Sequence, residues 1–327
     1  MKLGILGTGM IVKDLCRTIK EFNIEYVSIL GTEQTREETE SMKDQMGFNR
    51  THYDYDEMLA SEVDTIYVAL PNHLHYAFSK KALLAGKHVI IEKPITSNGQ
   101  ELKELMDIAK EKELMIFEAM STHYLPAYIS MKEDLNKIGS LKIVNFNYSQ
   151  YSSRYNAFKQ GTILPAFDYT KSGGALMDIN VYNVHAIIGM FGFPKDAQYL
   201  PNIENKIDTS GIMMYDYGTF KALSIGAKDC KAPILSTMQG DLGTIMIERP
   251  VNGMTSYKIV YNNGEIEEKS FDSSTHRLYY EFMEFMRIMN EKDWARHNEL
   301  LEMSYGISCL MENARKKAGV IFTADKA

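Results

Sequence analysis

Strand-like and helix-like segments alternate along the first 120 residues, and this alternation limits the fold more than any other feature of the sequence. Short β-branched runs, which suit strands buried on both faces, lie at 2–6, 25–30, 65–69, 89–91 and 114–117. Segments with apolar residues at helical spacing separate these runs. The pattern is typical of an α/β fold with a doubly wound parallel sheet.

The rhythm changes after Glu118. Residues 140–151 alternate apolar and polar side chains, and the segments from 196 to 270 are short, alternating and punctuated by turns. A helix is expected at 175–191, and two more at 275–290 and 297–318. We therefore predict a domain over 1–120 and a C-terminal α+β domain over 121–327 with a mainly antiparallel open sheet. The last helices are candidates to pack back on the first domain.

Charge and cysteine usage narrow the function. The chain has 36 basic and 43 acidic side chains and no Lys/Arg block, which argues against nucleic acid or an anionic membrane as a partner. Cys16, Cys230 and Cys309 are far apart and odd in number, as expected of reduced thiols rather than disulfides or a zinc site. The sequence begins directly with a strand and has no run of roughly 18 apolar residues. We expect a cytoplasmic protein with a small-molecule substrate.

The first strand runs directly into a glycine turn followed by a helix. One glycine makes the tight turn, the next lets the backbone approach a pyrophosphate, and the helix N-terminus offers N–H groups to the phosphate charge. Val12 stands where the full fingerprint has a small residue. The predicted cofactor contacts in this turn are Gly7, Thr8, Gly9, Met10 and Ile11.

The second strand ends in Gly31-Thr32-Glu33, with Arg36 one turn further on. The residue after this strand usually distinguishes the ribose hydroxyl of NAD from the 2′-phosphate of NADP. Glu33 could accept a hydrogen bond from a ribose, whereas Thr32 and Arg36 could hold a phosphate. Gly31 and Thr32 are predicted cofactor contacts, and the choice between NAD and NADP stays open.

Two further strands end in polar residues that we expect to line the cofactor groove, because ligands bind at the carboxyl ends of parallel strands. The H-x-H pair of His73 and His75 also invites a metal interpretation, but no third ligand accompanies it, and we predict no metal. An ordinary polar strand end is the alternative for Glu92 and Lys93. The predicted groove residues are Leu70, Pro71, Asn72, His75, Glu92 and Lys93.

The helix over 175–191 carries a polar stripe opposite an apolar face. At 100° per residue, Asp178, Tyr182 and His185 fall on one side of it. A carboxylate, a phenol and an imidazole in this arrangement suggest a catalytic set. The alternative is a buried, mutually hydrogen-bonded trio that serves structure alone.

Four motifs occur in a characteristic order and with characteristic gaps: G-T-G-M-I, A-L-P-N-H-L-H, A-G-K-H-V-I-I-E-K-P and G-G-A-L-M-D-I-N-V-Y. Together they resemble the glucose–fructose oxidoreductase / inositol dehydrogenase family (Gfo/Idh/MocA) over nearly the whole chain. The resemblance implies an N-terminal Rossmann domain and a C-terminal open-sheet domain that also makes a homodimer or homotetramer. It implies NAD(P)-dependent redox at a hydroxyl-bearing carbon of a sugar, polyol or cyclic diol.

By position, Lys93 matches the family's E-K-P lysine and Asp178 the carboxylate of the helix motif. Tyr182 stands where many members have histidine, as in the branch with glucose–fructose oxidoreductase and the dimeric dihydrodiol dehydrogenases, and His185 is an extra candidate one turn on. The match has three departures. Val12 replaces the usual small residue, and Gly31-Thr32 replaces the Ser-Arg common in NADP-using relatives. Ser121-Thr122-His123 stands where dihydrodiol dehydrogenase-like members often carry Trp-Thr-Arg.

The resemblance implies hydride transfer between the nicotinamide and a carbinol carbon. Tyr182 would exchange the hydroxyl proton, and Lys93 would supply the cation that lowers its pKa or stabilises the alkoxide. Asp178 would orient the substrate, and His185 would be an alternative base or a supporting residue. The alternatives are a glycosidase-like enzyme that oxidises its sugar transiently and a non-catalytic NAD(P)-sensing protein.

Overall fold

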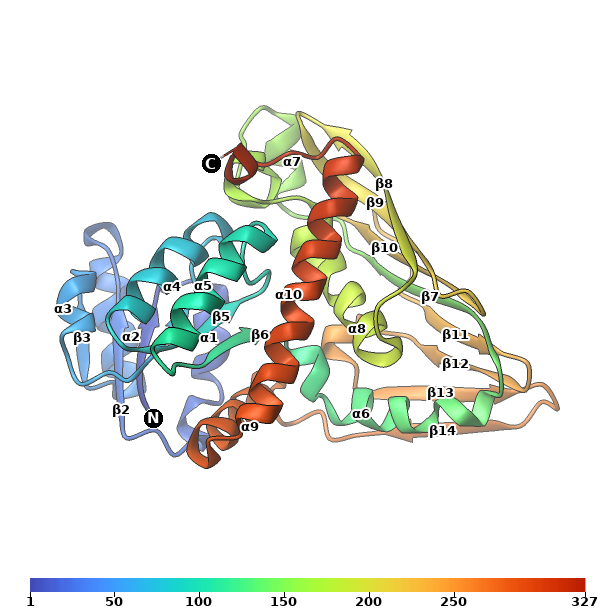
Figure 1. Ribbon diagram of the computed structural model, residues 1–327, viewed down its shortest axis with the longest axis horizontal. Helices are drawn as coiled ribbons and strands as arrows, with labels where there is room; N and C mark the ends of the chain where they lie inside the picture. The colour runs from blue at the N-terminus through green and yellow to red at the C-terminus, as the bar shows by residue number, and fades with distance from the viewer. Residues whose placement is uncertain (327) are drawn as a thin grey trace. The chain divides into compact units, whose positions relative to one another are not determined.

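The computed structural model describes residues 1–326, which divide into two compact units (Figure 1). Unit 1 comprises Met1–Ala119 and Leu278–Ser308, and unit 2 comprises Met120–Arg277 and the residues from Cys309 on. Residues 278–308 lie within the predicted C-terminal domain, 121–327, but cluster with the N-terminal segment in the structure. That clustering is the alternative that the sequence left open for the last helices.

Unit 1 contains a six-stranded sheet in the order β3-β2-β1-β4-β5-β6, and all its strand pairs are parallel. Its strands are β1 (Lys2–Leu6), β2 (Tyr26–Leu30), β3 (Arg50–His52), β4 (Thr65–Val68), β5 (His88–Glu92) and β6 (Ile116–Ala119). The predicted doubly wound parallel sheet is therefore confirmed. The prediction lacked β3, because its sequence R-T-H has no apolar residue to mark a buried strand.

Helices pack on both faces of this sheet. Leu6, Val68 and Ile91 lie in the core cluster that includes residues of α3, α4 and α5. On the other face the ring of Phe285 in α9 lies 4.7 Å from that of Phe117. The helices of unit 1 are α1 (Met10–Cys16), α2 (Arg36–Met46), α3 (Tyr55–Leu59), α4 (His75–Leu84), α5 (Gly99–Glu111), α9 (Arg277–Glu291) and the first part of α10 (Trp294–Lys317), with 3-10 turns η1 (Ile19–Glu21), η2 (Glu33–Thr35) and η3 (Asn72–Leu74).

Unit 2 contains an eight-stranded sheet in the order β14-β13-β12-β11-β7-β10-β9-β8. Its strands are β7 (Leu141–Ser149), β8 (Asp196–Glu204), β9 (Ile207–Asp216), β10 (Lys221–Ala227), β11 (Ser236–Gly240), β12 (Gly243–Ile247), β13 (Ser256–Tyr261) and β14 (Ile266–Ser270). Only the β7–β10 pair is parallel within the described residues. The mainly antiparallel sheet is as predicted.

Short helices accompany this sheet. They are α6 (Pro126–Glu133), α7 (Tyr155–Lys159), α8 (Val181–Phe191), the 3-10 turns η4 (Ser121–Tyr124), η5 (Asp134–Ile138), η6 (Pro165–Phe167), η7 (Tyr169–Lys171), η9 (Val251–Gly253) and η10 (Thr323–Lys326), and the π-helical turn η8 (Leu176–Asn180). No helix within residues 1–326 is both long and apolar enough to cross a membrane.

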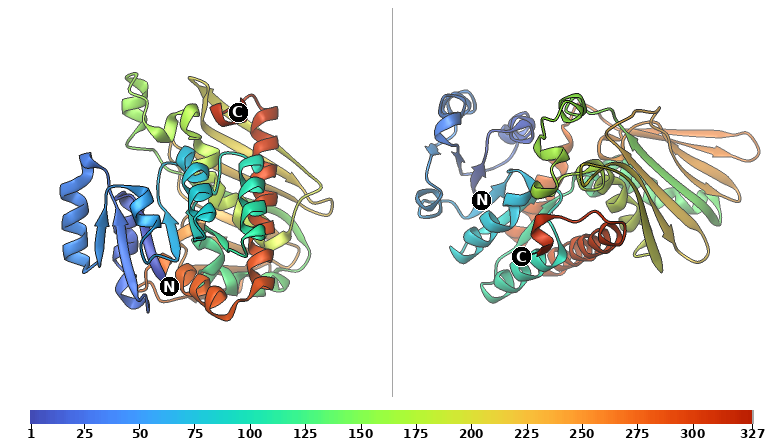
Figure 2. Two further views of the ribbon diagram at one scale, coloured as in Figure 1. Left: turned by 60° about the vertical axis from the view of Figure 1, so that its left-hand side comes forward. Right: turned by 90° about the horizontal axis from the view of Figure 1, so that it is seen from above.

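One face of the eight-stranded sheet carries η8 and α8, and no helix of unit 2 within residues 120–326 covers the other face (Figures 1 and 2). Alternate residues of each strand point to each face. Val144 and Phe146 of β7 are buried toward the helix, whereas Ile143 is 46% exposed. The sheet is therefore open on one side, as predicted.

Candidate active site

The glycine turn after β1 has the geometry of a pyrophosphate-binding turn. Gly7 has φ +96°, and a Cβ there would lie 3.0 Å from the carbonyl oxygen of Ala69, so the fold requires glycine. At Gly9, the N-cap of α1, no heavy atom lies within 4 Å of the Cβ position. The space in front of the turn is open, and the residues present fit an NAD(P) pyrophosphate. Thr8 is buried and Met10 is 72% exposed.

Val12, the departure from the small residue of the fingerprint, is fully buried in the first turn of α1. The side chain fills the core beneath the helix, so the helix does not depend on a glycine there for its packing. Ile11, one position earlier, is half-buried at the same end of the helix.

The end of β4 and the end of β5 are joined by a buried histidine. His75 is fully buried; its Nδ1 lies 2.9 Å from the carbonyl oxygen of Pro94 and its Nε2 lies 2.7 Å from that of Leu70. Burial lowers the pKa of His75 to about 4. The sequence predicted that His75 lines the cofactor groove. In the structure the His75 side chain is buried and lies between the loop after β4 and the loop after β5. Pro71 and Asn72, by contrast, are exposed and half-buried.

Three charged residues gather at the carboxyl ends of β5 and β6. Glu92 is buried and accepts a hydrogen bond from the Tyr67 hydroxyl at 2.5 Å. Glu118 is buried and accepts a hydrogen bond from the backbone N–H of Ile95 at 3.1 Å. Burial raises the pKa of Glu118 to about 7, although hydrogen bonds from Ser304 and from the Ile95 N–H, and then the charge of Lys93, act to lower it. Lys93, half-buried, therefore stands among carboxylates at the sheet edge.

Glu118 was not among the predicted site residues. The sequence placed it directly after a buried strand, the same signal that identified Lys93. The missing information was that β6 pairs with β5 in the sheet, with Ala119 opposite Glu92.

In unit 2 the predicted helix starts with a wider π-helical turn, and an aspartate fixes its first residues. Asp208 is buried, and its Oδ2 accepts hydrogen bonds from the Leu176 N–H and the Tyr199 hydroxyl, both at 2.7 Å. Burial raises the pKa of Asp208 to about 6. A Cβ at Gly174 would lie 2.0 Å from the Asp208 carboxylate, which explains the glycine before the helix.

Two buried asparagines then hold the helix on β10. Asn180 donates to the carbonyl oxygen of Ser224 at 3.4 Å, and Asn183 donates to that of Ile225 at 3.1 Å. A Cβ at Gly226 would lie 2.5 Å from the Cβ of Asn180, so the glycine permits the close approach. This packing fixes the position of the π-helical turn relative to the end of β10.

The result is an ion pair between a buried lysine and a partly exposed aspartate at the site predicted for catalysis. Lys228, directly after β10, is 3% exposed, and its ammonium group pairs with the Asp178 carboxylate. The same ammonium group donates to the carbonyl oxygen of Ala166 at 3.1 Å and lies 4.6 Å from the ring centre of Phe167. The Asp178 side chain is 36% exposed, whereas every other residue from 172 to 188 is buried.

Sequence reasoning missed Lys228. A lysine is almost never fully buried without a partner, but its burial cannot be read from the run A-L-S-I-G-A-K. The available signal was again a charge directly after an apolar strand.

Tyr182 and His185 follow Asp178 along the helix but differ in surroundings. The Tyr182 ring lies 6.3 Å from that of Tyr148 on β7. His185 is 1% exposed, and its Nδ1 lies 3.1 Å from the Nε2 of His123. Burial lowers the pKa of His185 to about 3, so the imidazole is neutral near pH 7. His123 and Ser121 are the two residues that depart from the Trp-Thr-Arg often found in dihydrodiol dehydrogenase-like members.

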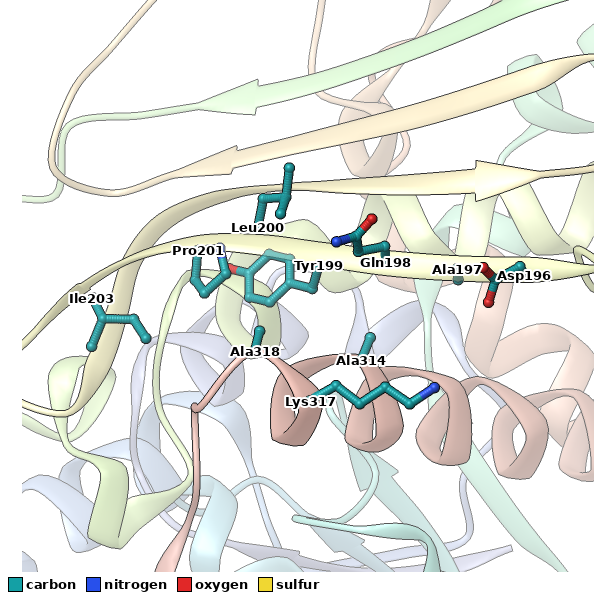
Figure 3. A pocket seen from close by; sticks show the side chains of 10 residues that line it. All are labelled: Asp196, Ala197, Gln198, Tyr199, Leu200, Pro201, Ile203, Ala314, Lys317 and Ala318. Carbon is teal, nitrogen blue, oxygen red and sulfur yellow. The ribbon is translucent and has the colours of Figure 1, made fainter.

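A surface pocket of about 560 Å³ lies between β8 and the end of α10, both in unit 2 (Figure 3). Tyr199 and Pro201 line it from the strand and Lys317 from the helix. None of the predicted catalytic residues lines it. The described residues also contain no group of three or more His, Cys, Asp or Glu side chains that could hold a metal ion.

Comparisons with known proteins agree with this geometry. Residues 1–120 match the Gfo/Idh/MocA family model, described as an oxidoreductase family with an NAD-binding Rossmann fold. The scyllo-inositol 2-dehydrogenase (NADP(+)) IolU of Bacillus subtilis is 32% identical over 334 residues, which cover 100% of both chains. The chain belongs to the Gfo/Idh/MocA family. It is an NAD(P)-dependent oxidoreductase that acts on CH–OH groups.

More distant relatives extend the comparison. The D-xylose 1-dehydrogenase (NADP(+)) of Hypocrea jecorina is 25% identical over 98% of this chain and 93% of its own length. The crystal structure of KijD10, a 3-ketoreductase from Actinomadura kijaniata in complex with NADP, has a TM-score of 0.81 and 19% identity, and covers 98% of this chain and 99% of that one. This structural likeness concerns the fold.

Proposed function

We propose that the enzyme transfers a hydride between NAD(P) and a carbinol carbon of a sugar, polyol or cyclic diol. The observation that carries the proposal is the full-length match, at 32% identity, to a relative named as an inositol dehydrogenase. Relatives named as xylose and dihydrobenzenediol dehydrogenases support the same substrate class. Residues 1–120 would bind the cofactor, and 121–327 would supply the substrate-binding residues and the oligomer contacts.

Within unit 1, the backbone of the Gly7-Thr8-Gly9 turn would hold the pyrophosphate, and Leu70, Pro71 and Asn72 would line the groove. When bound, the nicotinamide supplies the redox chemistry by accepting or releasing a hydride. Lys93 would present a positive charge to the oxygen on the reacting carbon, which stabilises the alkoxide that develops there. Glu92 and Glu118 would hold the lysine at the sheet edge.

Within unit 2, Tyr182 would exchange the proton of the reacting hydroxyl, and Asp178 would accept a hydrogen bond from the substrate. Lys228 supports this role, because a paired ammonium group fixes the direction of the carboxylate. We assign the proton exchange to Tyr182 rather than His185, since the buried imidazole has a pKa of about 3 and faces His123. His185 would then support the helix that carries Tyr182.

We further propose that the open face of the eight-stranded sheet joins two copies of the chain. Leu200, Ile212 and Met214 point outward and are 47%, 40% and 39% exposed. Leu200 lies opposite Ile212 across the β8–β9 pair, and Ile225 lies opposite Ile212 across the next. Contiguous exposed apolar area of this kind marks protein interfaces.

The oligomer proposal predicts a dimer or tetramer by light scattering. Ile212→Asp would place a charge in the interface and should shift the protein to monomer, with the dissociation constant raised at least about tenfold. Leu84→Asp on α4, an equally apolar exposed position at 54%, should leave the mass unchanged. A wild-type protein that is monomeric by light scattering would contradict the proposed oligomer.

We also propose a cytoplasmic location. Cys16 and Cys230 carry free thiols, and reduced cysteines are typical of the cytosol. Detection of the native protein in a secreted fraction would contradict this.

The function is tested by offering the purified protein NAD⁺ or NADP⁺ together with inositols, D-xylose and cyclic diols, and following nicotinamide absorbance. We expect reduction with at least one member of the panel. Binding of cofactor without net reduction, combined with cleavage of an aryl glycoside, would replace the dehydrogenase by the glycosidase-like alternative.

A further inference from the structure

We propose that Glu38, on α2, makes the enzyme prefer NAD over NADP by accepting a hydrogen bond from the adenosine ribose. The inference rests on the cofactor-binding role of unit 1. It concerns a position that the sequence left open, since neither Gly31 nor Thr32 carries the charge that usually decides between the two cofactors.

The starting point is the close approach of α2 to the end of β2. Gly31 is buried, and a Cβ there would lie 2.1 Å from the Oγ1 of Thr39 and 3.0 Å from its Cβ. No side chain can therefore stand directly after β2, where an acidic residue usually meets the ribose. The helix occupies that space instead.

The close packing of α2 against the end of β2 also brings Glu38, the residue before Thr39, next to the glycine turn. The Thr8 hydroxyl donates to Glu38 Oε2 at 2.9 Å, and the Lys13 ammonium group lies 2.6 Å from Glu38 Oε1. The pairing with Lys13 and the bond from Thr8 lower the pKa of Glu38, so the carboxylate is ionised near pH 7. Thr8 is the residue between the two glycines of the turn.

This position matches the path of the adenosine. The pyrophosphate binds at the turn and the ribose follows it toward the end of β2. The Glu38 carboxylate accepts a hydrogen bond from Thr8 of the glycine turn and lies on α2, the helix that follows β2. It is therefore placed between the pyrophosphate turn and the end of β2. The two oxygens of the Glu38 carboxylate offer about four lone-pair sites. Thr8 and Lys13 occupy two of them, so the carboxylate can still accept a hydrogen bond from a ribose hydroxyl. A 2′-phosphate in the same place would meet like charge.

The two cations described near this position, Lys13 and Arg36, already have carboxylate partners, Lys13 in Glu38 itself. Arg36 donates to Glu33 through Nε at 2.9 Å and through a terminal nitrogen at 2.6 Å, and its guanidinium lies 3.8 Å from the ring centre of Tyr53. Residues 31–40 contain four glutamates and this one arginine. The local charge is therefore unfavourable to a phosphate. On this point the chain would differ from the relatives whose names specify NADP.

The test is titration of the wild-type protein and three variants with NADH and NADPH, read by cofactor fluorescence. We expect the wild type to bind NADH at least about tenfold more tightly than NADPH. Glu38→Gln should weaken NADH binding about tenfold or more and leave NADPH binding equal or tighter, because one charge-assisted hydrogen bond and one repulsion are lost.

Two matched variants separate the position from the charge. Glu37→Gln removes the same charge from an exposed neighbour on α2 and should change the NADH to NADPH ratio less than about threefold. Arg36→Gln should also leave NADPH binding within about threefold. Tighter binding of NADPH by the wild type, or a selective loss of NADPH on Arg36→Gln, would overturn the role of Glu38. Failure of the wild type to bind either nucleotide would instead overturn the proposed function.

Discussion

At the scale of single residues, burial gives several side chains of the site unusual protonation. Glu118 shows the consequence most simply, because it is buried and its pKa is raised to about 7. A carboxyl group whose pKa is higher in the folded state stabilises the fold at low pH. That stabilisation is lost as pH rises through about 7.

Glu118→Gln should therefore change the pH dependence of stability. The wild-type free energy of unfolding should fall relative to that of the variant by about 2–3 kcal/mol between about pH 5 and about pH 8. Urea unfolding at both pH values measures this, with the exposed Glu111→Gln as control. A difference between wild type and Glu118→Gln that is independent of pH would show that the buried carboxyl does not titrate as described.

Residues within continuous sequence motifs were the most predictable part of the proposed site. Lys93 and Asp178 could be predicted because each lies in a motif whose residues are contiguous in the sequence. Lys228, Glu118 and Glu38 could not, because their partners lie far away in the sequence and only the packing of helix on strand brings them together.

At the scale of elements, a glycine on β10 allows the helix that carries Asp178 and Tyr182 to pack against the sheet. A Cβ at Gly226 would lie 2.5 Å from the Cβ and 3.0 Å from the Cγ of Asn180. Both groups lie close to the backbone and have little freedom to move, so the helix or the strand must shift.

Gly226→Ala should destabilise the protein by about 1–3 kcal/mol, the usual cost of overpacking a close contact. Gly253→Ala is the control, since nothing lies within 4 Å of its Cβ position, and it should change stability by less than about 0.5 kcal/mol. Chemical denaturation of both variants gives the comparison. Equal stabilities would mean that the contact is relaxed at no cost.

Elements were predicted best where their periodicity is strong. The alternation of β1 to β6 with helices was evident from buried β-branched runs, whereas β3 was missed because it is short and polar. The helix over 175–191 was predicted in place, but not its π-helical first turn, which depends on Asp208 and on the asparagine contacts to β10.

At the scale of the whole molecule, the residues proposed for cofactor binding lie in unit 1, and those proposed for proton exchange lie in unit 2. Unit 1 carries the glycine turn and Lys93, and unit 2 carries Asp178, Tyr182 and the buried Lys228. The order of these motifs along the chain made the family predictable, and the full-length relatives agree with it. The return of residues 278–308 to unit 1 could be foreseen only as an alternative, because an amphipathic helix does not specify which core it covers.

The most direct test of this account is the turnover of Lys93→Met on a substrate found in the panel. Loss of the cation should lower kcat by at least about 10²-fold while NADH affinity stays within a few-fold, because in the proposed mechanism Lys93 acts on the reacting oxygen. Lys81→Met, an exposed lysine on α4, should keep the wild-type rate. A Lys93→Met enzyme with wild-type kcat would contradict the assignment of the active site.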